Sequence, residues 1–217
     1  MKSTLEIEKQ LDQYAWCLHS IKLRIDFLGQ LLAGKKVGVS TNHLLPDVEV
    51  SAVQLRKSLE LIAMASITAN ETEYKAVHDA FKKHWNAKYI VRDIERINPD
   101  FYPKPFIQKD DESGRKVDLE PKTDYLTKEK FIDLYEWCGG RLHALNPYRQ
   151  DRDEGIKYKN DLHHIEQARQ QIVCLLNQHR TVLSSNRTEI WCLMESSGRN
   201  GKPQAFLMTK HKFSNQT

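Results

Sequence analysis

The chain has 217 residues, of which 40% are hydrophobic and 29% are charged, and its formal charge is +4. This length suits one domain of ordinary size, and the composition excludes a disordered chain. No apolar run approaches the roughly 18 residues of a membrane-spanning helix, and so small a charge surplus does not require a polyanionic partner.

The N-terminal residues 1–6 become polar and acidic where a secretion signal needs an apolar stretch. The four cysteines lie far apart in the sequence, and none belongs to a CxxC pair. This spacing, without an export signal, predicts reduced thiols in a cytoplasmic protein that has no membrane partner. The cysteines are Cys17, Cys138, Cys174 and Cys192.

The first predicted helix begins at Ser3 or Thr4, either of which can cap it, and ends before Gly34. Its apolar residues recur in steps of three and four, which places them on one helical face. A stripe this narrow lines either a seam inside a helical bundle or the interface of a homodimer. The residues of the stripe are Leu11, Tyr14, Leu18, Ile21, Ile25, Leu28 and Leu32.

Two more helices are predicted before residue 98. After a connector at residues 37–46, the second helix spans about residues 47–70, and its small residues allow a neighbouring backbone to come close. The third helix runs from about Glu71 to Ile97. Asn98 and Pro99 stop it, because a proline disfavours helical geometry in the residue before it.

Residues 98–126 are predicted to form a long irregular loop. The first half of this segment is rich in proline and aromatic residues, which suggests that it packs on the helices. Residues 106–108 and 116–119 could pair as a short hairpin around residues 111–114.

A fourth helix is predicted to begin at Thr127 and to continue to residues 146–147. It contains Gly139 and Gly140, and each glycine in a helix interior costs roughly 1 kcal/mol relative to alanine. Their presence indicates a close backbone contact, a kink or room for a ligand. A fifth helix is predicted after a charged linker at residues 148–157, with His179 on its inner face.

Residues 188–194 and 204–209 are strand-like, and the Asn-Gly pair at residues 200–201 is a strong hairpin-turn signal. The predicted fold is therefore mainly α: a five-helix bundle with a long irregular loop at residues 98–126 and a C-terminal β-hairpin. The expected domains are a bundle at residues 1–183 and a hairpin appendage at residues 184–217. Because a lone hairpin is marginal in water, it must pack on the bundle, join a strand from the loop or pair with another chain.

Several familiar sites are excluded, since the chain lacks the GxxxxGK, GxGxxG, GxSxG and HExxH motifs. Asp161 and His164 share a helical face, but His163 points away from that face by about 100°. Two ligands do not make a metal site. We therefore expect neither a metal nor a cofactor.

A small polar set occurs on helices that otherwise face the core. Arg56 and Glu60 are four residues apart on the second helix, and Tyr135, Gly139 and His143 follow the same spacing on the fourth. A phenol and an imidazole close to an Arg–Glu pair would form an acid–base and anion-binding cluster. The alternative is a polar network that fixes the register of the helices.

Residues 55–62 (LRKSLELI) and residues 135–143 (YEWCGGRLH) resemble patterns of the HEPN-like superfamily. Residues 97–103 and 142–147 also resemble a set of uncharacterised bacterial proteins, so that the resemblance spans roughly residues 50–147. The superfamily consists of all-helical domains that associate with nucleotides and RNA in bacterial toxin–antitoxin and phage-defence systems. The resemblance implies a regulatory or defence role with RNA or a partner protein.

The chain departs from the superfamily's nuclease motif. Active members carry an arginine, then four to six residues, then a histidine, and they cut RNA without a metal, often as dimers. Here Arg141 precedes His143 with one residue between them. On a helix these two side chains project about 200° apart, so that they cannot bind one phosphate together.

Three hypotheses follow. The first is a non-catalytic HEPN-like module that binds RNA or a protein, as a homodimer through the first helix. The second is a metal-independent, toxin-like ribonuclease, and the third is a structural protein that dimerises through the first helix. The candidate catalytic residues are His143, Arg56, Tyr135 and Glu60. The candidate RNA-binding residues are Arg141, Arg149 and Arg152.

Overall fold

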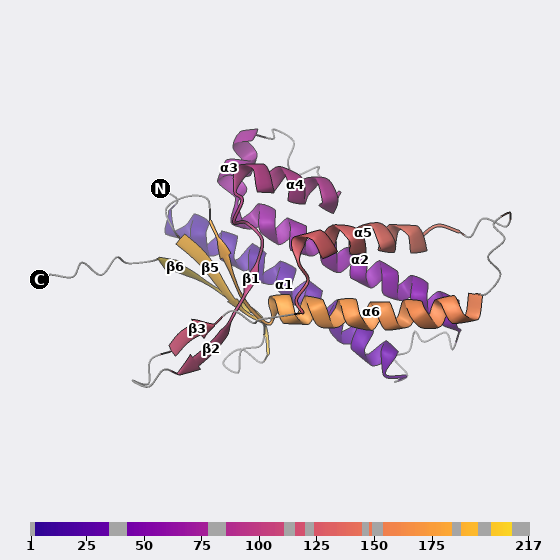
Figure 1. Cartoon of the computed structure of the whole chain (residues 1–217). Helices are drawn as coiled ribbons and strands as arrows, with labels where there is room; N and C mark the ends of the chain where they lie inside the picture. The colour runs from indigo at the N-terminus through magenta and orange to yellow at the C-terminus, as the bar shows by residue number, and fades with distance from the viewer. Residues whose placement is uncertain are drawn as a thin grey trace, which may run out of the picture.

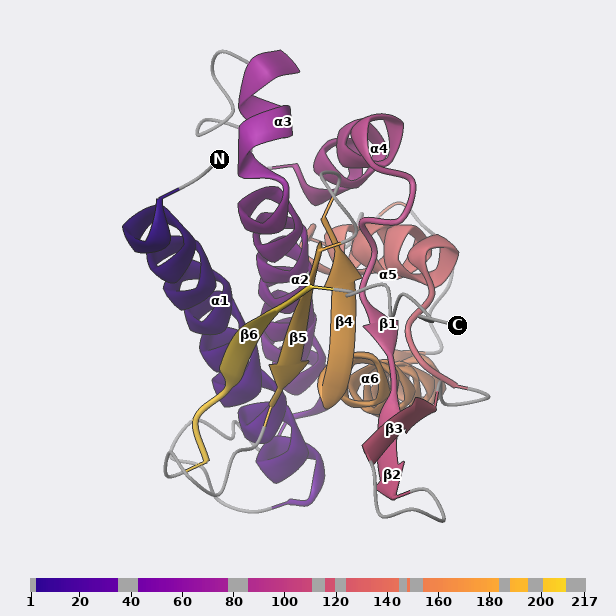
Figure 2. The same ribbon diagram turned by 90° about the vertical axis from the view of Figure 1, so that its left-hand side faces the viewer.

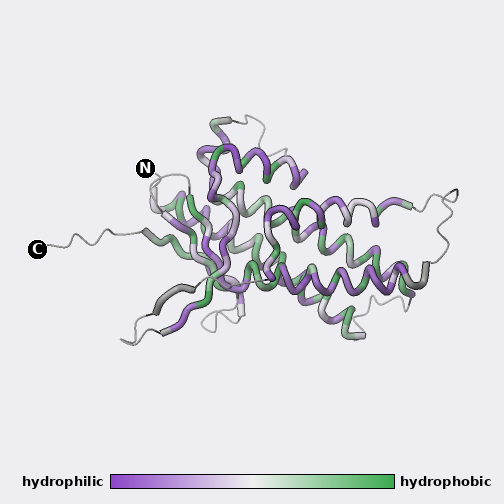
Figure 3. The backbone as a smooth tube through the Cα atoms, in the orientation of Figure 1, coloured by the Kyte–Doolittle hydropathy of each residue, from purple (hydrophilic) through white to green (hydrophobic). Residues whose placement is uncertain are grey.

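The computed structural model describes residues 3–34, 43–77, 86–110, 116–119, 124–144, 148, 154–183, 188–194 and 201–209. These residues form six helices and six strands. Figure 1 shows α1, α2, α5 and α6 running alongside one another, with the strands gathered at one end of the helices. In Figure 3 hydrophobic and hydrophilic residues alternate around these helices, as expected for helices with one buried face. The helices are α1 (Thr4–Leu32), α2 (Leu44–Ala69), α3 (Glu71–Val77), α4 (Ala87–Ile97), α5 (Lys128–Arg141) and α6 (Glu154–Leu176). The strands are β1 (Lys104–Pro105), β2 (Ile107–Asp110), β3 (Lys116–Leu119), β4 (Gln178–Val182), β5 (Thr188–Leu193) and β6 (Gln204–Thr209).

The predicted start of α1 is confirmed. The Ser3 hydroxyl accepts a hydrogen bond from the Glu6 backbone, and the Glu6 carboxylate accepts one from the Ser3 backbone, which together form a capping box. Most of the predicted apolar stripe is buried, with Ile21 and Leu28 fully inaccessible, and Leu11 and Leu32 near its two ends are partly buried. Most of the stripe therefore packs into the bundle.

Helix α2 is the centre of the bundle and contacts α1, α4, α5 and α6. It begins at Leu44, earlier than expected, with Pro46 in its first turn. Proline is tolerated there because the first backbone N–H groups of a helix have no helical partner. The small residues Ala63 and Ser66 are buried, as their size predicted.

The prediction of one helix from Glu71 to Ile97 is wrong. The backbone of Asn86 is extended, and its side chain accepts hydrogen bonds from the backbones of Lys88 and Tyr89 at the start of α4. Asparagine is a strong N-cap, so that it begins a new helix where the apolar pattern alone predicted continuation. The part of the predicted helix at residues 78–85 lies outside the described residues.

The expected irregular loop at residues 98–126 contains three strands. The short hairpin is confirmed as β2 and β3, with Ile107 opposite Leu119 and Asp110 opposite Lys116. Strand β1 pairs with β4, which is far away in the sequence. The description of the whole segment as irregular is therefore wrong.

The fourth and fifth predicted helices are both shorter at their C-terminal ends. Helix α5 begins after its cap Thr127, as predicted, but ends at Arg141. The expected stop at residues 146–147 lies outside the described residues. Helix α6 ends at Leu176, and His179 belongs to β4. The prediction of five helices and the helical assignment of His179 are wrong.

The predicted strands at residues 188–194 and 204–209 are present as β5 and β6. They extend an antiparallel sheet with the order β1-β4-β5-β6, which Figure 2 shows in front of the helices. The expected boundary between residues 183 and 184 thus falls between the paired strands β4 and β5. In the part of the chain that the structure describes, every helix is too short or too polar to cross a membrane.

A buried hydrogen-bond network attaches the sheet to α1. The Tyr14 hydroxyl lies 3.0 Å from His179 Nε2 and 3.0 Å from Thr181 Oγ1. His179 Nδ1 lies 3.0 Å from the Leu176 carbonyl, so that Nδ1 carries the proton and Nε2 accepts one from Tyr14. Burial lowers the pKa of His179 to about 4, so that the imidazole is neutral at physiological pH.

Candidate functional site

The polar set predicted on the second and fourth helices lies between α2 and α5, which pack side by side. Arg56 Nη2 donates a hydrogen bond to the Tyr135 hydroxyl at 2.8 Å, and Nη1 donates a longer one to the Tyr135 carbonyl at 3.4 Å. The guanidinium carbon lies 4.1 Å from the centre of the Tyr135 ring. The predicted proximity of Arg56 and Tyr135 is confirmed.

Glu60 completes this cluster, because its Oε1 lies 3.3 Å from Arg56 Nε. The Arg56 and Glu60 side chains are 28% and 35% exposed, so that solvent weakens the ion pair. Tyr135 lies beneath them and is buried. Burial raises the pKa of the Tyr135 hydroxyl, although the Arg56 charge lowers it and Glu60 raises it further.

Gly139 allows the close approach of Arg56 to α5. A Cβ atom at this position would lie 3.0 Å from Arg56 Nη1, which is tighter than an ordinary contact. A Cβ atom at Gly140 would meet nothing within 4 Å. The sequence suggested a close contact, a kink or room for a ligand as reasons for the two glycines. The close contact is the reason that applies to Gly139.

His143 does not join the cluster. Because α5 ends at Arg141, the helical spacing that was expected to place His143 on the same face as Tyr135 does not extend to His143. The imidazole is exposed. Within the described residues it makes no hydrogen bond with Arg56 or Tyr135, whose polar contacts are with each other and with Glu60 and Ala87.

Arg141 takes part in a second polar cluster, between α5 and α6, which the sequence did not predict. Its Nη2 donates a hydrogen bond to Asp161 Oδ1 at 2.7 Å, and its guanidinium lies over the Trp137 ring at 5.1 Å. The Trp137 ring in turn contacts His164, whose pKa is lowered mainly by burial. The spacings of Trp137 with Arg141 and of Asp161 with His164 show which side chains share a helical face, but not that the two faces meet.

The remaining predicted residues add no further ligand set. Arg149 and Arg152 lie outside the described residues. Across the ranges that the structure describes, no group of three His, Cys, Asp or Glu residues could hold a metal ion. All four cysteines are free, and burial raises the pKa of Cys138 to about 12, which disfavours a nucleophilic thiolate.

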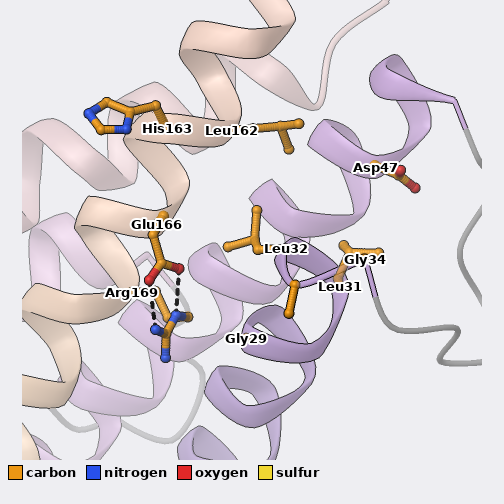
Figure 4. Close-up of a pocket in the computed structure, with 10 residues that line it drawn as sticks. Gly29, Leu31, Leu32, Gly34, Asp47, Leu162, His163, Glu166 and Arg169 are labelled. Atoms are coloured by element: carbon orange, nitrogen blue, oxygen red, sulfur yellow. Dashed lines mark hydrogen bonds and ion pairs between the residues drawn. The ribbon is translucent and has the colours of Figure 1, made fainter.

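A cavity of about 560 Å³ lies between α1, α2 and α6, and Figure 4 shows its lining. Arg169 and Glu166 face each other there through two hydrogen bonds of 2.7 Å, so that the cation is neutralised by its own neighbour. Leu31 and Leu32 supply the apolar wall. None of the predicted site residues lines this cavity.

Comparisons of the chain with protein-family models, with curated proteins and with solved structures find no match. The HEPN-like resemblance of residues 55–62 and 135–143 therefore stays a prediction. The function has to be inferred from the contacts that these residues make in the fold.

Proposed function

We propose that this chain is a HEPN-like regulatory or defence module that binds RNA without cutting it. The contact between Arg56 and Tyr135 carries the proposal. It brings together residues 55–62 and 135–143, the two segments in which the resemblance lies. A resemblance that rests on two segments far apart in sequence gains weight when those segments touch in the fold.

The geometry supports binding over catalysis. Metal-independent cleavage of RNA needs an acid–base group near the operating pH and within hydrogen-bond reach of the reacting atoms. His143 is exposed beyond the end of α5, and burial raises the pKa of Tyr135 away from neutrality. The ribonuclease alternative requires His143 to move to Arg56, Tyr135 and Glu60 when RNA binds.

The proposal takes RNA as the ligand because the superfamily that these two segments resemble associates with nucleotides and RNA. The formal charge of +4 is compatible with this ligand but does not require it. A homodimer remains an alternative, but most of the predicted stripe on α1 is buried in the bundle. A dimer through α1 would have to use its outer face, where Trp16 and Leu23 are exposed.

The test measures fluorescence anisotropy of labelled single-stranded RNA with the full chain at low and high salt, together with denaturing gels of the same samples. Binding that weakens with salt and leaves the RNA intact supports the proposal. Cleavage that is lost in His143→Ala supports the ribonuclease and overturns it. Absence of RNA binding at low salt also overturns the proposed RNA-binding function. In that case, a dimer mass measured by light scattering would favour the structural alternative.

A further inference from the structure

The four-stranded sheet has an outer face that the polar clusters do not use. In β4, His179 and Thr181 point towards Tyr14 of α1. Because successive residues of a strand point to opposite faces, Arg180 between them points outwards. Figure 2 views the sheet from this side, and no described helix lies over it.

One register row crosses all four strands on this outer face. Lys104 of β1 is opposite Arg180 of β4, Arg180 is opposite Trp191 of β5, and Trp191 is opposite Phe206 of β6. Residues that are opposite one another in a sheet share a face. The row therefore holds two cations followed by two aromatic side chains, over about 14 Å at the usual spacing between strands.

The Trp191 indole is held in place on this face. Its Nε1 donates a hydrogen bond to Glu189 Oε2 at 2.8 Å, and its ring lies 4.7 Å from that of Phe106. Neighbours on both sides thus limit the rotation of the ring. An aromatic side chain that is already fixed loses little entropy when a ligand stacks on it.

The two ends of the row are open to a ligand. Phe206 is 43% exposed at the aromatic end. At the cationic end, the Lys104 ammonium lies 2.8 Å from Asp100, and the two side chains are 43% and 62% exposed. An ion pair this exposed contributes little stability, so that a phosphate can compete for the lysine.

We propose that this row binds single-stranded RNA, with a base stacked on Phe206 beside Trp191 and a phosphate at Lys104 and Arg180. The inference rests on the proposed RNA-binding function and gives it a location. The row separates positive charge from aromatic surface, as a nucleotide separates its phosphate from its base. A duplex hides the faces of its bases inside the stack, so that this surface selects single strands.

The test uses the full chain and fluorescein-labelled oligouridine, with an RNA duplex of the same length as the competing ligand. We expect Phe206→Ala to weaken oligouridine binding about tenfold, the loss typical of one stacked base. Lys104→Gln should weaken binding and reduce the dependence of log K on log salt by about one charge. Tyr89→Ala is the matched control, because this exposed aromatic lies on α4 and should leave the affinity unchanged.

Phe206→Leu keeps the apolar contact with the sheet but removes the aromatic face, so that it separates stacking from folding. Circular dichroism spectra check that each variant is folded. If Phe206→Leu and Lys104→Gln both bind oligouridine with wild-type affinity, the proposed location on the sheet is wrong, although RNA binding itself stands. The same holds if the protein binds the duplex as tightly as the single strand. Failure of the wild-type protein to bind either RNA overturns the proposed function itself.

Discussion

Acidification should destabilise the protein through His179. This side chain is fully buried, with Nδ1 bonded to the Leu176 carbonyl and Nε2 to the Tyr14 hydroxyl. A proton on Nε2 would replace an acceptor with a donor and place a charge away from solvent. The folded state therefore holds the pKa of His179 at about 4.

The size of the effect follows from linkage. An unfolded histidine titrates near pH 6.5, so that between about pH 6.5 and pH 4 the unfolded chain binds a proton that the folded chain excludes. The stabilising contribution is complete above this range and is lost as the pH falls through it. The loss relative to pH 7.5 is about 2 kcal/mol at pH 5 and about 3 kcal/mol at pH 4. Typical proteins have a free energy of unfolding of about 5–15 kcal/mol, so that a loss of this size is measurable.

Urea unfolding followed by tryptophan fluorescence at pH 7.5 and pH 5 provides the measurement. His179→Gln cannot titrate in this range, so that its stability should fall by about 2 kcal/mol less than that of the wild type between the two pH values. His163→Gln, at an exposed position on α6, is the control and should behave like the wild type. If wild type and His179→Gln lose the same stability on acidification, the reasoning is refuted.

Two further predictions concern α5. Gly140→Ala should raise the free energy of unfolding by up to about 1 kcal/mol, whereas Gly139→Ala should gain less or lose stability because its Cβ would lie 3.0 Å from Arg56 Nη1. Thermal and urea unfolding measure both stabilities, and an equal gain in the two variants would contradict the close contact of Gly139 with Arg56. Arg141→Met should cost about 3 kcal/mol, since it leaves Asp161 buried without its cation, and adding Asp161→Leu should restore most of the loss. A double variant no more stable than the single one would show that the pair does not behave as a buried salt bridge.

The sequence predicted the helix boundaries that neighbouring residues mark better than those that depend on distant partners. Ser3 and Thr127 cap α1 and α5 through hydrogen bonds to residues three positions later, so that the signal is local. The end of α6, in contrast, is not marked by a local signal. His179 leaves the helical pattern because β4 pairs with β1 and β5, and nothing in the residues around His179 reveals those partners.

The same distinction applies to the candidate site. Arg56 and Tyr135 could be predicted to meet because each lies inside a long helix, where the spacing of apolar residues determines which side faces the bundle. His143 could not be placed in this way, since its position depends on where α5 ends. The contact of Arg141 with Asp161 joins two helices whose packing partners are not visible in either sequence segment.

The buried network and the proposed RNA surface depend on the same strand register. Side chains alternate along β4, so that the contact which places His179 and Thr181 against Tyr14 also places Arg180 on the outer face of the sheet. A slip of one residue would exchange the two faces: it would turn the charged Arg180 side chain into the core and remove the hydrogen-bond partners of Tyr14. Because both consequences are unfavourable, the inner hydrogen bonds specify which side chains β4 presents beside Trp191 on the outer face.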